Sequence, residues 1–202
     1  MEHLSIVGIS GSLRKLSFNT ALLRASASVL GDLSADLTLI PIELPLYNAD
    51  LIQSGAVERF KQAIEGAGAV LIATPEYNFG PPGPLKNAID WASRPAYRSV
   101  FRDKPVGVIG ASGSVVGTAR AQGQLKQVLL GMASQVFPYP ELLVGNAAQR
   151  FDERGQLTDD ETRQRLTAYL RDFVAWVRRV QLRTVEQPVQ PEPAEHEHHD
   201  GQ

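Results

Sequence analysis

The side chains best suited to chemistry lie in a short polar segment after the first apolar run of the chain. Leu4–Ile9 is typical of a buried strand, and segment 10–20 then offers hydroxyls, amides and the guanidinium of Arg14 just before a predicted helix. Donors that converge at a helix N-terminus can hold a phosphate dianion. The segment has neither a Walker A nor a G-x-G-x-x-G sequence, which favours a monophosphate over a pyrophosphate. The alternative is that Ser17 or Asn19 only caps the helix.

Two further loops have the composition of ligand-binding loops. Segment 74–87 is rich in proline and contains two glycines, and its Tyr77 and Phe79 can border a planar ring. Taken alone, this loop is explained equally well as a stiff turn with one aromatic in the core. Segment 110–117 consists mainly of Gly, Ser and Val, so a ligand can approach its backbone closely. Ser/Gly loops are common, and this one is weak evidence by itself.

The elements that position these loops alternate between strand and helix. Apolar runs predict strands at 4–9, 35–42, 69–74, 105–110 and within 135–144, the last interrupted by Pro138 and Pro140. Helices are predicted from about Asn19, around 57–64, at 85–93, at 118–132 and from 158, where Thr158 and Glu161 have the spacing of a capping box. Strands that are apolar on both faces indicate a parallel α/β sheet covered by helices on both sides. The loops after the first, third and fourth strands then share the carboxyl edge of the sheet, where ligands bind.

Composition excludes several other kinds of chemistry. The chain has 202 residues, enough for one domain with a full core, and no cysteine, which rules out disulfides, thiolate metal sites, iron–sulfur clusters and cysteine nucleophiles. All four histidines lie near the ends of the chain (His3, His196, His198 and His199), so the body holds no histidine base for a Ser-His-Asp hydrolase and no metal site is expected.

Charge separates the chain into a body and a tail. Residues 186–202 contain five acidic residues and no Lys or Arg, which leaves +3 on the remainder of a chain whose net charge is −2. We expect one domain over 1–185 and a disordered, acidic, Pro- and His-containing tail over 186–202. The alternative for the tail is binding of a transition metal by its imidazoles and carboxylates. The balanced charge gives no reason to expect nucleic acid as a partner. Neither a signal peptide nor a membrane-spanning run is visible, so a cytoplasmic protein without membrane insertion is expected.

Three segments together resemble the NADPH-dependent FMN reductase family, and within it the bacterial quinone and chromate reductases. They are Gly-Ser-Leu-Arg-Lys-x-Ser-x-Asn at 11–19, Leu-Pro-Leu-Tyr-Asn-Ala-Asp at 44–50 and Pro-Glu-Tyr-Asn-x-Gly-x-Pro-Gly-x-Leu-Lys-Asn-Ala-Ile-Asp-Trp at 75–91. The resemblance covers roughly residues 4–180. It implies a flavodoxin-like three-layer sandwich with a five-stranded parallel sheet in the order 2-1-3-4-5. It also implies bound FMN, NADPH or NADH as hydride donor, and a homodimer or homotetramer with FMN near the interface.

The resemblance also implies which residues bind the cofactor. The phosphate is expected at Ser12, Arg14, Ser17, Asn19 and Thr20. The isoalloxazine ring is expected against Pro75, Glu76, Tyr77, Asn78, Gly80, Ser112 and Gly113, with Phe79 at a position that tunes the substrate face. Arg120, Ala121, Gln122 and Glu141 resemble a polar network between subunits, although Gly123 stands where the family pattern has an aromatic residue.

The expected reaction is a ping-pong transfer with no protein nucleophile. Hydride passes from the nicotinamide to flavin N5, the oxidised nicotinamide leaves, and an acceptor then takes the electrons. Backbone N–H groups of the 77–80 loop are expected to polarise the ring edge at N5 and O4. Quinone, chromate, azo compound, free flavin and oxygen all fit as acceptors. The alternative function is a flavodoxin-like electron carrier without its own NAD(P)H turnover.

Overall fold

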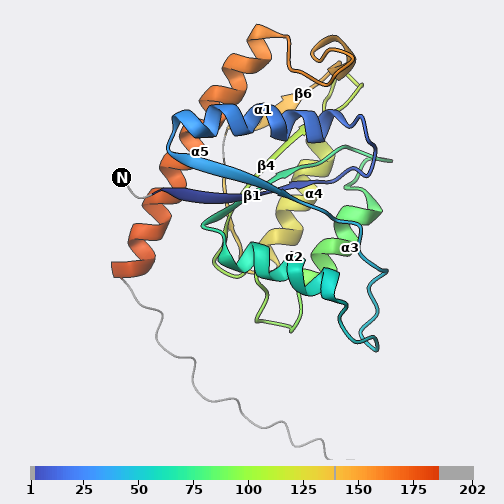
Figure 1. Ribbon diagram of the computed structural model, residues 1–202, viewed down its shortest axis with the longest axis vertical. Coiled ribbons are helices and arrows are strands. Elements are labelled where there is room, and N and C mark those ends of the chain that lie inside the picture. The colour runs from blue at the N-terminus through green and yellow to red at the C-terminus, as the bar shows by residue number, and fades with distance from the viewer. Residues whose placement is uncertain (1–2, 139, 187–202) are drawn as a thin grey trace, which may run out of the picture.

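The computed structural model describes residues 3–138 and 140–186 and shows a parallel sheet between two layers of helices (Figure 1). The elements are β1 (Leu4–Ser10), α1 (Phe18–Asp32), β2 (Ala35–Ile40), α2 (Gly55–Gly66), β3 (Ala69–Ala73), α3 (Gly83–Ala92), β4 (Pro105–Ala111), α4 (Ala119–Leu130), β5 (Gln135–Val136), β6 (Leu142–Val144), the 3₁₀ turn η1 (Ala147–Gln149) and α5 (Asp160–Glu186).

All strand pairs in the sheet are parallel, and the order is β2-β1-β3-β4-β5, which confirms the predicted order 2-1-3-4-5. The fifth position differs in detail from the prediction of one strand. β5 pairs with the beginning of β4, whereas β6 pairs with its end, from Ile109↔Leu142 to Ala111↔Val144. Pro138 and Pro140 lie between the two short strands, and a proline nitrogen cannot donate to a sheet.

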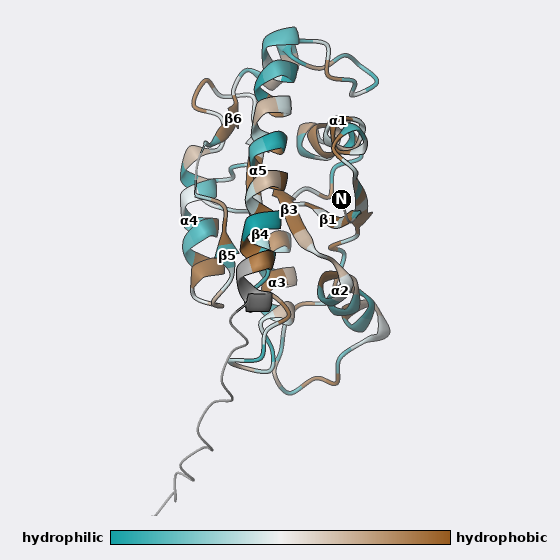
Figure 2. Cartoon of the chain, turned by 90° about the vertical axis from the view of Figure 1, so that its left-hand side faces the viewer, coloured by the Kyte–Doolittle hydropathy of each residue, from teal (hydrophilic) through white to brown (hydrophobic). Residues whose placement is uncertain are grey.

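The core has two parts because both faces of the sheet are covered. On one face the strands pack against α1 and α5, and on the other against α2, α3 and α4. β3 and β4 are buried along their whole length, which explains why their sequences are apolar without alternation. In Figure 2 the hydrophobic strands lie between helices whose outer turns are hydrophilic.

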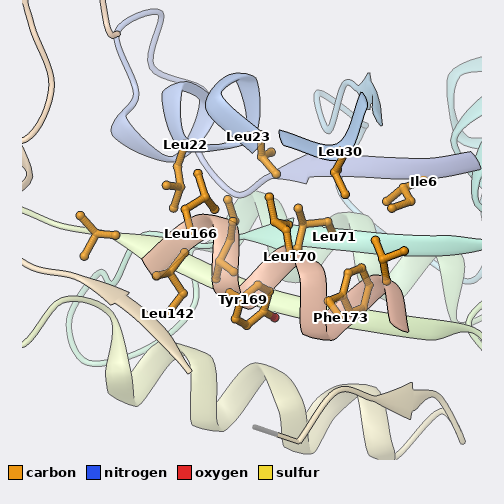
Figure 3. Packing of buried hydrophobic residues seen from close by; sticks show 14 of the residues in the cluster. Ile6, Leu22, Leu23, Leu30, Leu71, Leu142, Leu166, Tyr169, Leu170 and Phe173 are labelled. Carbon is orange, nitrogen blue, oxygen red and sulfur yellow. The ribbon is translucent and has the colours of Figure 1, made fainter. Parts of the chain in front are cut away.

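An apolar stripe packs α5 into the core, since Leu166, Tyr169, Leu170, Phe173 and Val177 are all buried. Figure 3 shows Leu166, Tyr169, Leu170 and Phe173 of α5 facing Leu22, Leu23 and Leu30 of α1 and the strand residues Ile6 and Leu71. The Tyr169 hydroxyl donates to the carbonyl of Val108 at 3.1 Å, and complete burial raises the pKa of this phenol.

The predicted cap of the last helix is wrong by one residue. Asp159, not Thr158, precedes the first turn of α5, and its Oδ2 accepts the N–H of Thr162 at 2.8 Å. Hydrogen bonds from Thr162 and Arg150 lower the pKa of the Asp159 carboxyl to about 2. The Thr158 hydroxyl instead donates to the carbonyl of Arg150 at 3.2 Å. Aspartate and threonine are both good caps, so the sequence at this point allowed either register.

Among the described residues, no helix is long and apolar enough to cross a membrane. Residues 187–202 of the predicted tail, including its three histidines, lie outside the described part of the chain. Between residues 3 and 186, Tyr139 excepted, His, Asp and Glu side chains form no group of three or more with the spacing of a metal site.

Candidate active site

Three loops meet at the carboxyl edge of the sheet, as the sequence predicts: the first loop (10–20), the second loop (74–87) and the third loop (110–117). Backbone hydrogen bonds connect these loops to the ends of neighbouring strands. Gly11 N–H in the first loop donates to Ala73 O of β3 at 2.8 Å, and Thr74 N–H in the second loop donates to Ile109 O of β4 at 3.0 Å. A Cβ atom on Gly11 would lie 3.1 Å from Pro75 Cδ and 3.0 Å from Leu85. These separations are shorter than ordinary Cβ contacts, so the first loop packs closely against the second at this glycine.

Two of the predicted phosphate ligands hold the first loop in place. Ser17 is buried and caps α1, since its Oγ accepts the N–H groups of Asn19 and Thr20 at 3.2 and 3.4 Å. Asn19 is also buried, and its amide both donates to the carbonyl and accepts from the N–H of Ala111 at 2.9 Å. The capping interpretation is thus confirmed for Ser17, and Asn19 connects the start of α1 to the end of β4.

The remaining polar groups of the first loop face outward. Ser12 is partly exposed and Arg14 is exposed, and the Thr20 hydroxyl lies 2.7 Å from the Ser10 hydroxyl. Within the described chain, the N–H groups of Leu13 and Lys15 have no hydrogen-bond partner. The loop therefore presents free donors just before a helix N-terminus, which is the donor set that a phosphate needs.

The second loop contains a tight turn with unusual backbone angles. Tyr77 and Gly80 exchange both of their backbone hydrogen bonds, at 3.0 and 3.1 Å, and the two residues between them have positive φ, 49° at Asn78 and 70° at Phe79. Positive φ at both central positions defines a type I′ turn, whose second position normally takes glycine. An aromatic residue there is strained.

This turn determines which N–H groups can reach a ligand. Tyr77 and Gly80 use theirs within the turn, which removes them from the predicted donors to the ring edge. Within the described residues, the N–H groups of Asn78 and Phe79 have no partner. Asn78 and Phe79 therefore offer free backbone donors to a planar ring.

Glu76 connects the second loop to α4. Its carboxylate accepts the N–H groups of Arg120 and Ala121 at 3.0 and 3.2 Å and pairs with Arg120 Nη1 at 2.9 Å. The N-cap residue Thr118 makes no capping hydrogen bond with its side chain, so Glu76 caps α4 from a distant part of the sequence. Only 10% of the Glu76 side chain is exposed.

Arg120 and Gln124 of α4 support the strained turn. The Arg120 guanidinium lies 4.3 Å above the centre of the Phe79 ring, and Gln124 Nε2 donates to Phe79 O at 2.8 Å. Phe79 as a residue is 64% exposed despite these contacts. Gln124 was not predicted from the sequence, because nothing near it in the chain indicates that α4 lies against the turn.

The third loop closes a hollow of about 400 Å³ with the second loop and α4. The lining residues are Glu76, Asn78, Phe79, Ser112, Gly113, Ser114 and Arg120. The Ser112 hydroxyl donates to Gly117 O at 2.7 Å, and Gly113 is exposed. The hollow thus brings together the predicted ring contacts Glu76, Asn78, Phe79, Ser112 and Gly113. Pro75, Tyr77 and Gly80 lie outside its lining, and Pro75 is buried.

The predicted network between subunits is wrong for Gln122. This side chain is fully buried, and its Nε2 donates to the Thr118 hydroxyl and to Leu142 O, both at 3.0 Å. It is therefore an internal support for the start of α4. Glu141 pairs with Lys126 of the same chain at 2.9 Å.

Comparisons with known proteins agree with this geometry. The sequence model described as NADPH-dependent FMN reductase matches residues 4–149. The chain belongs to this family. An NAD(P)H-dependent FMN reductase of Pseudomonas aeruginosa is 42% identical over 183 residues, which cover 89% of this chain and 98% of the relative. A 2-hydroxy-1,4-benzoquinone reductase of a Burkholderia species is 40% identical, covering 87% of this chain and 97% of the relative.

A solved structure shows the same fold. The NAD(P)H:(acceptor) oxidoreductase FerB of Paracoccus denitrificans superimposes with a TM-score of 0.81 at 37% identity, covering 87% of this chain and 98% of the FerB chain. The flavodoxin-like fold and the resemblance predicted from the sequence are both confirmed.

The residues present fit FMN. The first loop has free N–H groups and hydroxyls for a phosphate, and the hollow beside it has the size of a small-molecule site and free N–H groups at one wall. With the family membership, this makes the chain an FMN-dependent NAD(P)H oxidoreductase, as predicted. The electron-carrier alternative has no support from these relatives.

Proposed function

We propose that this chain reduces quinones with two electrons from NAD(P)H at the hollow between the second loop, the third loop and α4. The observation that carries this proposal is the wall made by Phe79 and Arg120, where a cation lies over an exposed aromatic ring. A quinone is a flat ring whose carbonyl oxygens gain negative charge on reduction. The ring can stack on Phe79, and the guanidinium can stabilise the oxygen. Relatives named quinone reductases support the same substrate class.

The first loop is proposed to anchor the phosphate of FMN. Ser12, Arg14, Thr20 and the free N–H groups of the loop donate to it, while Ser17 and Asn19 keep the loop in shape through the cap and the Ala111 bonds. Under this proposal, Arg14→Ala weakens FMN binding by about 1.5–3 kcal/mol, the range for a hydrogen bond to a charged group. An unchanged dissociation constant in a flavin-fluorescence titration would place the phosphate elsewhere.

The second and third loops are proposed to hold the isoalloxazine ring. The N–H groups of Asn78 and Phe79 would donate to polar atoms of the ring, Gly113 would allow close approach, and the buried Pro75 fixes the direction of the second loop. Tyr77, Gly80 and Ser112 keep the two loops in shape through the turn and the Gly117 hydrogen bond. Bound FMN supplies the redox chemistry, accepting hydride and passing two electrons on.

The electron balance of the overall reaction is simple. NAD(P)H gives up a hydride, which carries two electrons and one proton. The quinone takes two electrons and two protons to become a hydroquinone, and the second proton comes from water. The protein supplies position and charge, and Glu76 keeps the Arg120 guanidinium over the hollow. Chromate, an oxyanion, is a second candidate acceptor because the same guanidinium would attract it.

A panel of acceptors tests the proposal. Steady-state rates with benzoquinone, chromate, an azo dye, free FMN and oxygen are measured for the wild type, Arg120→Gln and the control Arg98→Gln, an exposed arginine between α3 and β4. Benzoquinone should give the highest kcat/KM, and Arg120→Gln should lower this value about tenfold or more. A benzoquinone rate no higher than that with oxygen, or equal loss in both variants, would contradict the proposal.

We also propose that the protein is a cytoplasmic homodimer or homotetramer with FMN near the interface. Large apolar side chains are exposed in the segment before α2 and in the third loop: Leu46, Leu51, Ile52, Val115 and Val116. Exposed apolar groups of this kind are typical of surfaces that bind another protein. Analytical ultracentrifugation of the FMN-loaded protein measures the assembly, and a monomer at micromolar concentration would contradict it.

A further inference from the structure

A second hollow, of about 310 Å³, is lined in part by the first loop. Its walls are the first loop and the first turns of α1 on one side, and the segment 148–155 that follows η1 on the other. The neighbouring rings of Phe18 and Phe151 line it, with 5.6 Å between their centres. Leu16 lies at its wall with 71% of the residue exposed. The hollow therefore offers apolar surface to a ligand.

The charge of this hollow is positive. Four cationic side chains line it, those of Arg14, Lys15, Arg24 and Arg154, and within the described residues none of them pairs with an acidic group. Two acidic residues, Asp152 and Glu153, also line it. Asp152 Oδ1 already accepts the N–H groups of Arg154 and Gln156 at 2.9 and 2.8 Å. These hydrogen bonds partly offset the negative charge of the Asp152 carboxylate.

Hydrogen-bonded segments connect the two hollows, although the hollows have no lining residue in common. Phe18 lines the second hollow, and the following residue, Asn19, forms two hydrogen bonds with Ala111. Ala111 directly precedes Ser112, which lines the first hollow. A second connection runs from Ser112 O to the N–H of Ala147, next to Ala148 of the second hollow. The two hollows therefore lie on neighbouring, hydrogen-bonded segments of the chain.

We infer that the second hollow binds the phosphorylated adenosine end of the hydride donor, so that the chain favours NADPH over NADH. This inference rests on the proposed function, because it assigns the second end of the same substrate. The adenine ring packs on the apolar surface of Phe18 and Leu16, and the 2′-phosphate pairs with Lys15, Arg24 and Arg154. Arginine suits a phosphate monoester because its planar fork donates two parallel hydrogen bonds. Arg14 belongs to the proposed FMN anchor, and the inference does not depend on it.

Calorimetric titration of the full-length, FMN-loaded protein tests the inference. The probes are adenosine 2′,5′-bisphosphate and 5′-AMP, which lacks the 2′-phosphate. The test variant is Arg24→Gln/Arg154→Gln, and Arg98→Gln is the matched control. Both replaced arginines are exposed, so the fold is expected to survive, and circular dichroism and the Tm confirm it.

The wild type and the control should bind the bisphosphate at least about tenfold more tightly than 5′-AMP, and the double variant should lose most of that preference. Its KM for NADPH should rise by a similar factor while its KM for NADH and its FMN dissociation constant stay the same. Equal binding of the bisphosphate by wild type and double variant would overturn the inference. A lower FMN affinity of the double variant would also overturn the inference, because it would show that the second hollow binds the flavin phosphate. If neither nicotinamide reduces the wild-type flavin, the proposed function fails, and the calorimetric comparison still decides the hollow.

Discussion

Replacing Glu76 by alanine removes the only side-chain cap that the described chain provides for α4, and also one partner of Arg120. The carboxylate accepts two backbone N–H groups at the start of the helix and a third hydrogen bond from the guanidinium. Loss of a helix cap costs about 1 kcal/mol. An ion pair with a half-exposed arginine adds at most about 1 kcal/mol. We therefore expect Glu76→Ala to lower the free energy of unfolding by about 2 kcal/mol.

Arg120→Ala gives the matched comparison. It removes the ion pair and the contact with the Phe79 ring but leaves the cap in place, so its expected cost is about 1 kcal/mol or less. Glu76→Gln keeps an oxygen that can accept the helix N–H groups, and it should fall between the two. All three variants should raise the KM for quinone, because Arg120→Ala removes the guanidinium from the hollow and the two Glu76 variants loosen its position there.

Urea unfolding followed by circular dichroism measures these differences. The titrations are repeated at two FMN concentrations, so that the contribution of flavin binding to stability can be subtracted. The account of α4 would be refuted if Arg120→Ala cost as much as Glu76→Ala, since the distant cap would then contribute nothing.

Three further predictions follow from other contacts. Asn19→Ala removes both hydrogen bonds to Ala111 and leaves buried polar groups unpaired. The free energy of unfolding in urea should therefore fall by about 2–5 kcal/mol at any FMN concentration. A loss of stability seen only with FMN present would instead identify Asn19 as an FMN ligand. Phe79→Gly relieves about 1 kcal/mol of backbone strain and loses a cation–π contact of about the same energy. The free energy of unfolding should therefore hardly change, while the KM for quinone rises. A stability loss above about 2 kcal/mol would contradict this prediction. The Asp159 carboxylate has a lowered pKa, so its stabilisation is complete above its ordinary pKa near 4 and is lost as the pH falls toward 2. Asp159→Asn should remove this part of the acid dependence in an acid titration of unfolding, and an unchanged profile would exclude the cap.

The sequence predicted the fold well because its signals are local. Apolar runs without alternation, such as Ala69–Ala73, are typical of strands covered on both faces, and the apolar stripe of α5 has the helical period. The split of the fifth strand was only partly predictable. Pro138 and Pro140 showed an interruption, but the return of the chain to pair with the end of β4 depends on β4 itself.

The site was predicted less completely because its supports come from distant segments. The loop compositions indicated that the site lies at the carboxyl edge of the sheet. They could not show that Asn19 forms hydrogen bonds with Ala111 or that Glu76 caps α4. Both contacts join residues more than 40 positions apart. The turn at Asn78–Phe79 was missed for another reason: its second position lacks the glycine that normally marks a type I′ turn.

Anaerobic mixing of the FMN-loaded protein with NADPH or NADH, followed by benzoquinone, tests the central claim most directly. The visible absorption of the flavin should bleach with at least one nicotinamide and return in full when one equivalent of quinone is added, with hydroquinone as the product. A flavin that stays oxidised with both nicotinamides, or one that bleaches but is not reoxidised by the quinone, would contradict the account.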